Sequence, residues 1–227
     1  MLGGFGCFSS FLVGQDELKV NHQLWGEYNP SYQLDDKIIL SSPIGVGTIF
    51  DDDWSQFYLK PSVRFNLNRT LEFRGGVGVY RTWRGDKSDR LEIRPWQGIK
   101  LNWPQLGLMR FYHYVRIEQR VSFLIDDYER SYDTRLRYKV GFKRRIDNQW
   151  QLEGYGEFFF DREEEIDEIF RNRAQVGLAL EYRSSSSLSY VIDLKFLRSR
   201  LRQEEDFSTS DLKLEFKVNH CLSCPQL

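Results

Sequence analysis

The sequence lacks any apolar run that approaches the roughly 18 residues of a transmembrane helix, which excludes a helical membrane protein. It also lacks an excess of either charge, because 32 basic and 33 acidic residues leave a net charge of -1. The overall charge therefore gives no reason to bind nucleic acid or an anionic membrane surface. Aromatic residues, in contrast, make up 15% of the chain, which favours strands over helices.

Cysteine is scarce. Cys7, Cys221 and Cys224 are an odd number and do not make a disulfide framework. The spacing in CLSC at 221–224 is typical of a redox pair, but no predicted helix follows that would activate a thiol. We interpret CLSC as an incidental pair or a local disulfide.

Residues for catalysis are also few. No Ser/His/Asp grouping can be assembled around His22, His113 or His220, and we interpret each histidine as structural. Carboxylates on the charged segments have arginines on neighbouring segments, and a carboxylate paired in this way is a poor general acid. The acidic run DREEEIDE lacks the donor spacing and glycine of a calcium loop, so we interpret it as a solvated loop. The sequence indicates no catalytic residue, metal or cofactor, and it favours a role without catalysis while leaving an enzyme open.

The dominant pattern is an alternation of charged and apolar residues, as in RFYHYVRIEQR at 110–120. Successive side chains of a strand point to opposite sides of the sheet, so this segment is a strand with one charged and one apolar face. Eleven segments show such period-two patterning. They lie at approximately 20–33, 37–48, 55–67, 70–83, 90–103, 106–123, 131–146, 149–160, 169–184, 187–201 and 209–220.

The breaks between these segments alternate in kind. Tight turns such as LDDK and LNRT alternate with longer acidic stretches such as FDDDWS and DREEEIDEI. An up-and-down meander places its connections alternately at two ends, so one end would carry short turns and the other long loops, as in an outer-membrane barrel. No linker divides the chain. We expect one β-barrel domain at 17–220, a truncated signal-like or strand-forming segment at 1–16, and a tail at 221–227.

Periodicity alone does not decide which face points inward, because an antiparallel sandwich alternates in the same way. Trp83, Trp103 and Trp150 lie at strand ends on the apolar face, where the lipid–water interface favours aromatic rings. The segments also match the roughly nine to eleven residues of a strand that crosses a bilayer at a tilt. We therefore predict that the apolar face meets lipid and that these tryptophans lie at the membrane interface.

The charged face would then line the lumen. RIEQR at 116–120 lies between EIR at 92–94 and RLR at 135–137, so that opposite charges can pair across neighbouring strands. In a small barrel such pairs would fill the interior and leave no wide channel. The predicted lumen charge cluster comprises Glu92, Arg94, Arg116, Glu118, Arg120, Arg135, Arg137, Glu153, Glu157, Arg171 and Arg173.

Five longer stretches carry a resemblance to a known family. They are LWGEYNPSYQL, LEIRPWQGIKLNWP, YVRIEQR, TRLRYKVGF and FRNRAQVGLALEYR. The region from about Gln23 to Arg183 resembles the bacterial domain-of-unknown-function 2490 family of outer-membrane β-barrel proteins. The resemblance implies an exported precursor and an outer-membrane barrel, and it implies no activity or catalytic residue. The chain departs from the usual barrel pattern at its end, where KVNHCLSCPQL follows Phe216.

We expect an all-β protein, an up-and-down antiparallel transmembrane-type β-barrel of 10 to 12 strands. Single-chain bacterial barrels have an even number of strands, so eleven segments leave one strand missing. We favour twelve strands, with residues 3–16 as the twelfth. Alternatively, that segment threads the lumen as a plug, or the weakest segment, 37–48, is not a strand and the count is ten.

The expected function is that of an integral outer-membrane β-barrel protein of a Gram-negative bacterium, with a polar, salt-bridged lumen and no specific activity that the sequence reveals. A narrow pore and a structural membrane role both stay open. The alternative is a soluble exported β-sandwich or barrel-like binding module with the apolar face turned inward. The expected partners are the lipid bilayer and the outer-membrane assembly machinery, without nucleic acid and with no identifiable small-molecule ligand.

Overall fold

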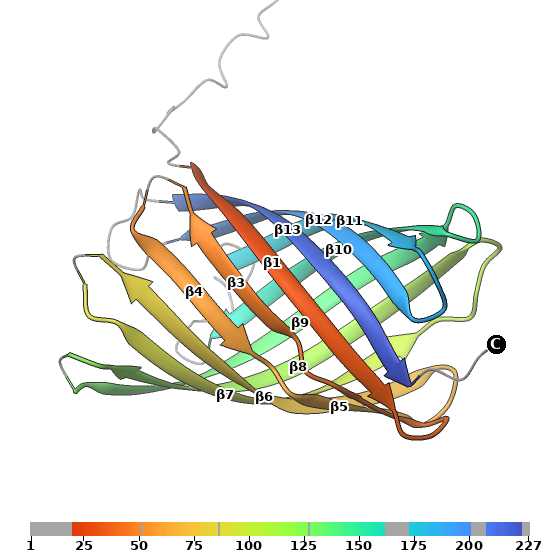
Figure 1. Ribbon diagram of the computed structural model, residues 1–227, viewed down its shortest axis with the longest axis horizontal. Coiled ribbons are helices and arrows are strands. Elements are labelled where there is room, and N and C mark those ends of the chain that lie inside the picture. The colour runs from red at the N-terminus through yellow and green to blue at the C-terminus, as the bar shows by residue number, and fades with distance from the viewer. Residues whose placement is uncertain are drawn as a thin grey trace, which may run out of the picture.

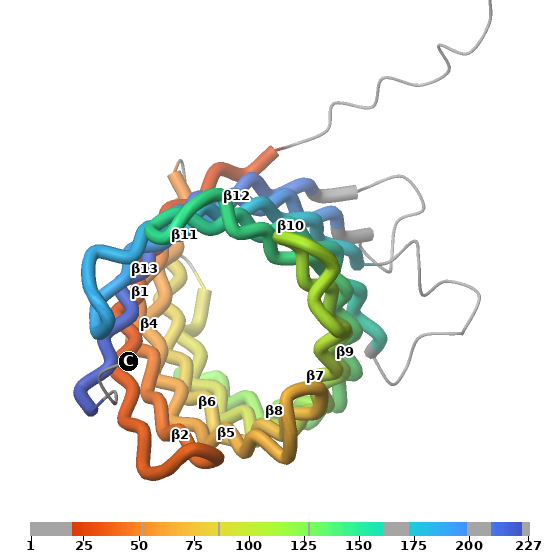
Figure 2. The backbone as a smooth tube through the Cα atoms, turned by 90° about the vertical axis from the view of Figure 1, so that its right-hand side faces the viewer, coloured from red at the N-terminus to blue at the C-terminus, as the bar shows by residue number. Residues whose placement is uncertain are grey.

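Thirteen β-strands and no helix make up the part of the chain that the computed structural model describes, residues 20–50, 52–85, 87–126, 128–161, 173–200 and 208–223. None of these residues therefore belongs to a helix that is long and apolar enough to cross a membrane. All the strands join in one sheet, which closes into a barrel (Figures 1 and 2). They are β1 (Val20–Gln33), β2 (Ile38–Ser41), β3 (Ile44–Ile49), β4 (Trp54–Leu59), β5 (Ser62–Asn66), β6 (Leu71–Arg84), β7 (Arg90–Asn102), β8 (Met109–Leu124), β9 (Arg130–Arg145), β10 (Trp150–Asp161), β11 (Arg173–Arg183), β12 (Leu188–Arg200) and β13 (Ser208–Ser223).

Two strand positions around the barrel are each divided at a proline. β2 and β3 pair in succession along β1, and β5 and β4 pair in succession along β6. Pro43 lies between β2 and β3, and Pro61 lies between β4 and β5. Proline has no N–H to donate to the ladder, so the strand is interrupted there. The thirteen strands of the described residues thus occupy eleven positions, which coincide with the eleven alternating segments of the sequence.

β1 and β13 close the barrel as a parallel pair, with Leu24 opposite Leu214. The other neighbouring pairs are antiparallel. The predicted count of twelve is therefore wrong. Residues 3–16, the expected twelfth strand, lie outside the described residues, but β13 already occupies the edge that they would need. The parity argument assumed antiparallel closure, whereas a parallel pair also satisfies the backbone groups of both edges and closes an odd count.

The outer surface of the barrel is apolar and its interior is polar. Val46 and Val176, at outward positions, are 57% and 59% exposed, whereas Glu92 and Glu118 are 0% and 1% exposed. In the stretch 110–120 the apolar set, including Val115, faces outward. The alternative of a sandwich or barrel-like module with its apolar face turned inward is therefore wrong.

Short turns lie at one end of the barrel, which we call the turn end, at the right of Figure 1. Four of these turns share one device, a side-chain oxygen that accepts hydrogen bonds from the backbone N–H groups two and three residues later. The acceptors are Asp35, Asn68, Asp147 and Ser185, at 2.7–3.3 Å. β13 also ends here, at Ser223, three residues into the expected tail. The opposite end is the loop end.

Candidate functional site in the barrel lumen

Inward side chains from all around the wall enclose a cavity of about 520 Å³. A second cavity of about 310 Å³ shares Glu27, Lys139 and Asp193 with it and continues to Gln151 and Asn219 near the turn end. Paired charges therefore line the wall and leave space between them. This differs from the filled interior that the sequence predicted.

A group of arginines and glutamates on β7–β10 forms what we call the arginine cluster. The Glu118 carboxylate lies 3.1 Å from Arg116 Nε and 2.8 Å from Arg137 Nη1. Arg137 also contacts Glu157, 2.8 Å away on β10. Because β8, β9 and β10 are consecutive neighbours, residues far apart in the chain meet across the ladder.

Glu92 is the second centre of the arginine cluster. Its side chain is fully buried, and its carboxylate lies 3.2 Å from both Arg90 and Arg120 and pairs with Arg94. The hydroxyl of Ser122 donates a further hydrogen bond to it at 3.0 Å. A buried carboxylate held by several cations stabilises the wall and is unsuited to proton transfer.

Two more residues of the predicted lumen cluster lie on the strands beside β10. The guanidinium carbons of Arg135 and Arg173 are 5.8 Å and 5.2 Å from the ring centroid of Phe159, and that of Arg137 is 4.9 Å away, so three cations lie at this ring. Arg135 is buried, at 7% exposure. Arg171 lies outside the described residues.

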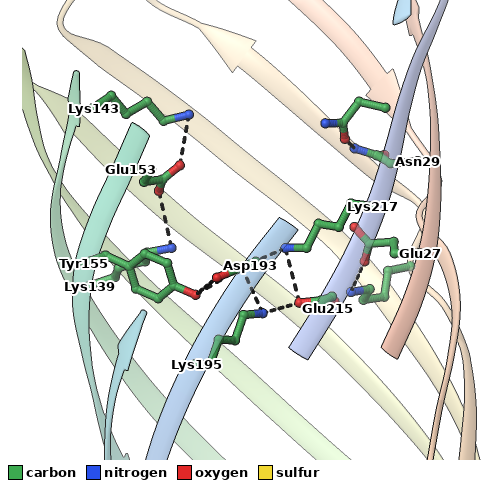
Figure 3. A network of polar contacts seen from close by, with 12 residues as sticks. Glu27, Asn29, Lys139, Lys143, Glu153, Tyr155, Asp193, Lys195, Glu215 and Lys217 are labelled. Atoms are coloured by element: carbon green, nitrogen blue, oxygen red, sulfur yellow. Dashed lines mark hydrogen bonds and ion pairs between the residues drawn. The ribbon is translucent and has the colours of Figure 1, made fainter. Parts of the chain in front are cut away.

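A second group of charges, the lysine cluster, was missed from the sequence (Figure 3). Lys195 and Lys217 each lie 3.2 Å from Asp193, and both also pair with Glu215. The hydroxyl of Tyr155 donates to Asp193 at 3.0 Å. Asp193 and Glu215 are direct partners in the ladder between β12 and β13, so the alternation of these two segments held a signal that could have found the pair.

The lysine cluster extends to both sides along the wall. Glu153 lies 3.6 Å from Lys139 and 3.1 Å from Lys143, so lysines rather than the expected arginines hold it. On the other side, Lys60 pairs with Glu27 of β1 at 3.1 Å. Closure of β1 onto β13 places Glu27 opposite Lys217 and joins this pair to the rest.

Aromatic rings of the lumen lie close against glycines of neighbouring strands. A Cβ on Gly177 would stand 2.2 Å from the ring of Tyr155, so only glycine leaves room for it. Rings placed in this way project little into the lumen, which helps to keep the cavity open. The same arrangement recurs for Trp25 on Gly47, Tyr58 on Gly45 and Tyr112 on Gly141.

Cations lie over the faces of the same rings, which are buried. The Lys139 ammonium lies 3.4 Å from the ring centroid of Tyr155. An ammonium over a ring face is attracted by the ring quadrupole, by about 0.5–2 kcal/mol. The wall therefore repeats a stack of glycine, aromatic ring and cation. The other pairs are Lys213 over Trp25 at 3.5 Å, Lys60 over Tyr58 at 3.9 Å and Lys100 over Tyr112 at 4.6 Å. Arg94 likewise lies 3.9 Å from the centroid of Tyr80, whose ring lies against Gly78 of the same strand.

The charges that line the larger cavity do not balance. The basic residues are Lys60, Arg74, Arg94, Lys100, Arg137, Lys139, Lys143, Lys195, Lys213 and Lys217. The acidic residues are Glu27, Glu153, Glu157, Asp193 and Glu215. Ten positive charges thus face five negative ones, although the whole chain carries a net charge of -1.

A metal-binding group is absent from the described part of the lumen. Within the described ranges no group of three or more His, Cys, Asp or Glu residues could hold a metal ion. The histidines His113 and His220 form hydrogen bonds with the hydroxyls of Tyr138 and Tyr28, at 2.7 Å and 2.9 Å, away from the cavity. The groups that the described lining offers to a solute are charges and hydrogen-bonding side chains.

The three tryptophans singled out from the sequence lie on the outer surface. Trp83, Trp103 and Trp150 are 43%, 50% and 38% exposed. Trp83 is at the loop end of β6, whereas Trp103 follows β7 and Trp150 begins β10 at the turn end. Together they flank the apolar outer surface on both sides, and Trp150 packs on Tyr182 with ring centroids 4.8 Å apart.

Comparison with known proteins gives a family and a fold. A family model described as "Protein of unknown function (DUF2490)" matches residues 22–208. No curated protein sequence matches the chain. The solved NanC porin superposes with a TM-score of 0.50 at 11% identity, over 87% of this chain and 98% of the porin, which shows a porin-like barrel fold. An anion-selective porin from Comamonas acidovorans superposes with a TM-score of 0.37 at 12% identity, over 81% of this chain and 58% of that porin, too weakly to extend any of its properties.

Proposed function

The chain belongs to the DUF2490 family, whose function is unknown, and we propose that it is an integral outer-membrane β-barrel of a Gram-negative bacterium with a narrow pore for small polar solutes. The observation that supports the proposal is that apolar side chains face outward and charged side chains face inward. Thirty-nine large apolar side chains of the described residues are exposed, and only seven apolar side chains are buried. A continuous apolar surface of this kind needs lipid or a partner to cover it.

The height of the apolar surface supports a bilayer as its environment. Along β6, outward residues from Phe73 to Trp83 are apolar at both limits, with exposures of 39% and 43%. Ten residues at about 3.4 Å each, tilted by roughly 40°, span about 25 Å, which is the height of the apolar band of outer-membrane barrels. In this proposal Trp83, Trp103 and Trp150 lie at the membrane interfaces.

The location has a direct test. In the proposed host, the protein is expected in the outer-membrane fraction after folding by the outer-membrane assembly machinery. It should resist carbonate extraction, require detergent for purification, and migrate faster on a gel before boiling than after. A monodisperse protein purified without detergent would contradict the membrane location.

The pore is supported by the charged cavity and has a test of its own. Purified protein reconstituted into planar lipid bilayers is expected to give discrete conductance steps, because water and ions occupy a polar lumen of about 520 Å³. The matched control is the same sample unfolded by boiling. Protein that is inserted and heat-modifiable but gives no steps would instead have a structural role in the membrane.

A further inference from the structure

We propose that the larger lumen cavity selects and binds small anions, such as halides, phosphate and carboxylates, through an uncompensated positive charge centred on Lys100 and Lys213. Selective passage of anions rests on the pore proposed above. Binding depends only on the cavity and its charges.

Lys100 and Lys213 differ from the other lysines of the cavity. Within the described ranges neither forms an ion pair with a carboxylate, and each lies over an aromatic ring instead, 4.6 Å from the centroid of Tyr112 and 3.5 Å from that of Trp25. An aromatic face offsets only a small part of the cost of a desolvated ammonium. The lysines with carboxylate partners are Lys60, Lys139, Lys143, Lys195 and Lys217.

The two lysines line separate parts of the wall of one cavity. β7, which carries Lys100, is five positions from β13, which carries Lys213, in a ring of eleven. Both residues line the larger cavity. An anion in the cavity would be attracted by both.

Salt does not screen this charge inside the cavity. A volume of 520 Å³ corresponds to a sphere of about 5 Å radius, and the Debye length at physiological ionic strength is about 8 Å. The excess positive charge of the cavity therefore acts on any ion that enters, and low-dielectric walls focus its field. Arg74, Arg94 and Arg137 already have carboxylate partners in the wall, which are Glu72, Glu92 and Glu118. The charge that a mobile anion can neutralise is therefore that of Lys100 and Lys213.

Cations gain no comparable site, because the carboxylates of the cavity are already held. Each one has a lysine or arginine within ion-pair distance, so none is available to an entering cation. The pairs are Glu27 with Lys60, Glu153 with Lys143, Glu157 with Arg137, and Asp193 and Glu215 with Lys217.

Binding can be measured without any conduction. Trp25 lies under Lys213, so its fluorescence reports which ions enter the cavity. The experiment is done in detergent micelles, with iodide and caesium as quenchers. The contribution of Trp25 is the part of the quenching that is lost in Trp25→Phe, and this part is compared between the two ions. A lumen potential of one kT favours a monovalent anion over a cation about sevenfold, which is the ratio expected for the wild type. Lys100→Gln/Lys213→Gln removes the two cavity charges that have no carboxylate partner, and the ratio should fall towards one.

Control variants distinguish the effect of charge inside the cavity from the effect of the net charge of the whole protein. Lys37→Gln/Lys87→Gln removes the same two charges at exposed positions outside the cavity and should leave the ratio unchanged. Glu27→Gln raises the excess and should increase the ratio. Heat-modifiable migration shows that each variant is folded. A wild-type ratio near one, or an equal fall in the control pair, overturns the inference.

Conduction tests the selective passage. Under a potassium chloride gradient in planar bilayers, the wild type is expected to favour chloride over potassium, and Lys100→Gln/Lys213→Gln should move the permeability ratio toward one. Conductance without anion preference overturns the inference and leaves the pore intact. Iodide preference in micelles without conductance sustains binding and contradicts the pore.

Discussion

At the scale of single residues, the lumen wall depends on carboxylates that have been taken almost completely out of water. The Glu118 side chain is 1% exposed and holds two arginines, whereas Glu181 is 21% exposed and pairs with an Arg183 that is 52% exposed. Breaking a buried ion pair is costly in stability, because removing one partner leaves the other charge buried without a counter-charge. Pairs in water lose little when they are broken.

Replacing Glu118 by alanine should therefore destabilise the barrel markedly. Arg116 and Arg137 would lose a shared partner inside the wall, and we expect a loss of about 3–5 kcal/mol, reduced somewhat by water in the lumen. Glu181→Ala is the matched control, with an expected loss of about 0–1 kcal/mol. The free energy of unfolding of both variants and of the wild type is measured in micelles by urea titration. Equal values for Glu118→Ala and the wild type would mean that the arginine cluster is simply solvated.

At the scale of strands, pairs of neighbours carry features that neither strand shows alone. Tyr155 on β10 lies against Gly177, its direct ladder partner on β11. Gly156, one residue further along β10, has no heavy atom within 4 Å of where its Cβ would be. Two glycines of adjacent strands thus differ completely in the space around them.

Gly177→Ala is expected to destabilise the barrel by about 1–3 kcal/mol, because the ring of Tyr155 must leave its place on the wall. Gly156→Ala should change stability little. Unfolding in micelles gives both values. The cost of Gly177→Ala should largely vanish in a Tyr155→Ala background, and a cost that persists there would show that the ring is not its cause.

At the scale of the whole molecule, the parallel pair of β1 and β13 decides how the barrel closes. The two strands pair from Val20 opposite Ser210 to Tyr32 opposite Ser223. Any strand inserted between them would separate Leu24 from Leu214 by about 10 Å instead of about 4.8 Å.

A cysteine pair at Leu24 and Leu214 should therefore form a disulfide on mild oxidation, since neighbouring strands place Cα atoms within the range of about 4.4–6.8 Å that disulfides need. The crosslink should appear as a shift in gel mobility that a reductant reverses. Leu24→Cys with Phe196→Cys, on β12, is the control and should stay reduced. Failure of the first pair in folded protein would revive a twelfth strand.

Local alternation predicted much of this protein. The segment predicted at 149–160 is β10 at Trp150–Asp161, and the two faces of residues 110–120 lie as their residue types indicated. Local pattern is sufficient here because a strand shows its two faces within a few residues. The divided strands at Pro43 and Pro61 did not change the count, since each half continues along the same neighbour.

The sequence by itself determined the all-β class, the eleven alternating segments, and a charged face set against an apolar one, because each of these is encoded within single segments. It did not determine the strand count, which we predicted as twelve. Only the tertiary structure decided the closure of β1 on β13, the lysines around Glu153 and Asp193, and the open cavity. These features depend on the register of tilted strands and on which distant segments share a wall. Periodicity within a segment carries no information about either one.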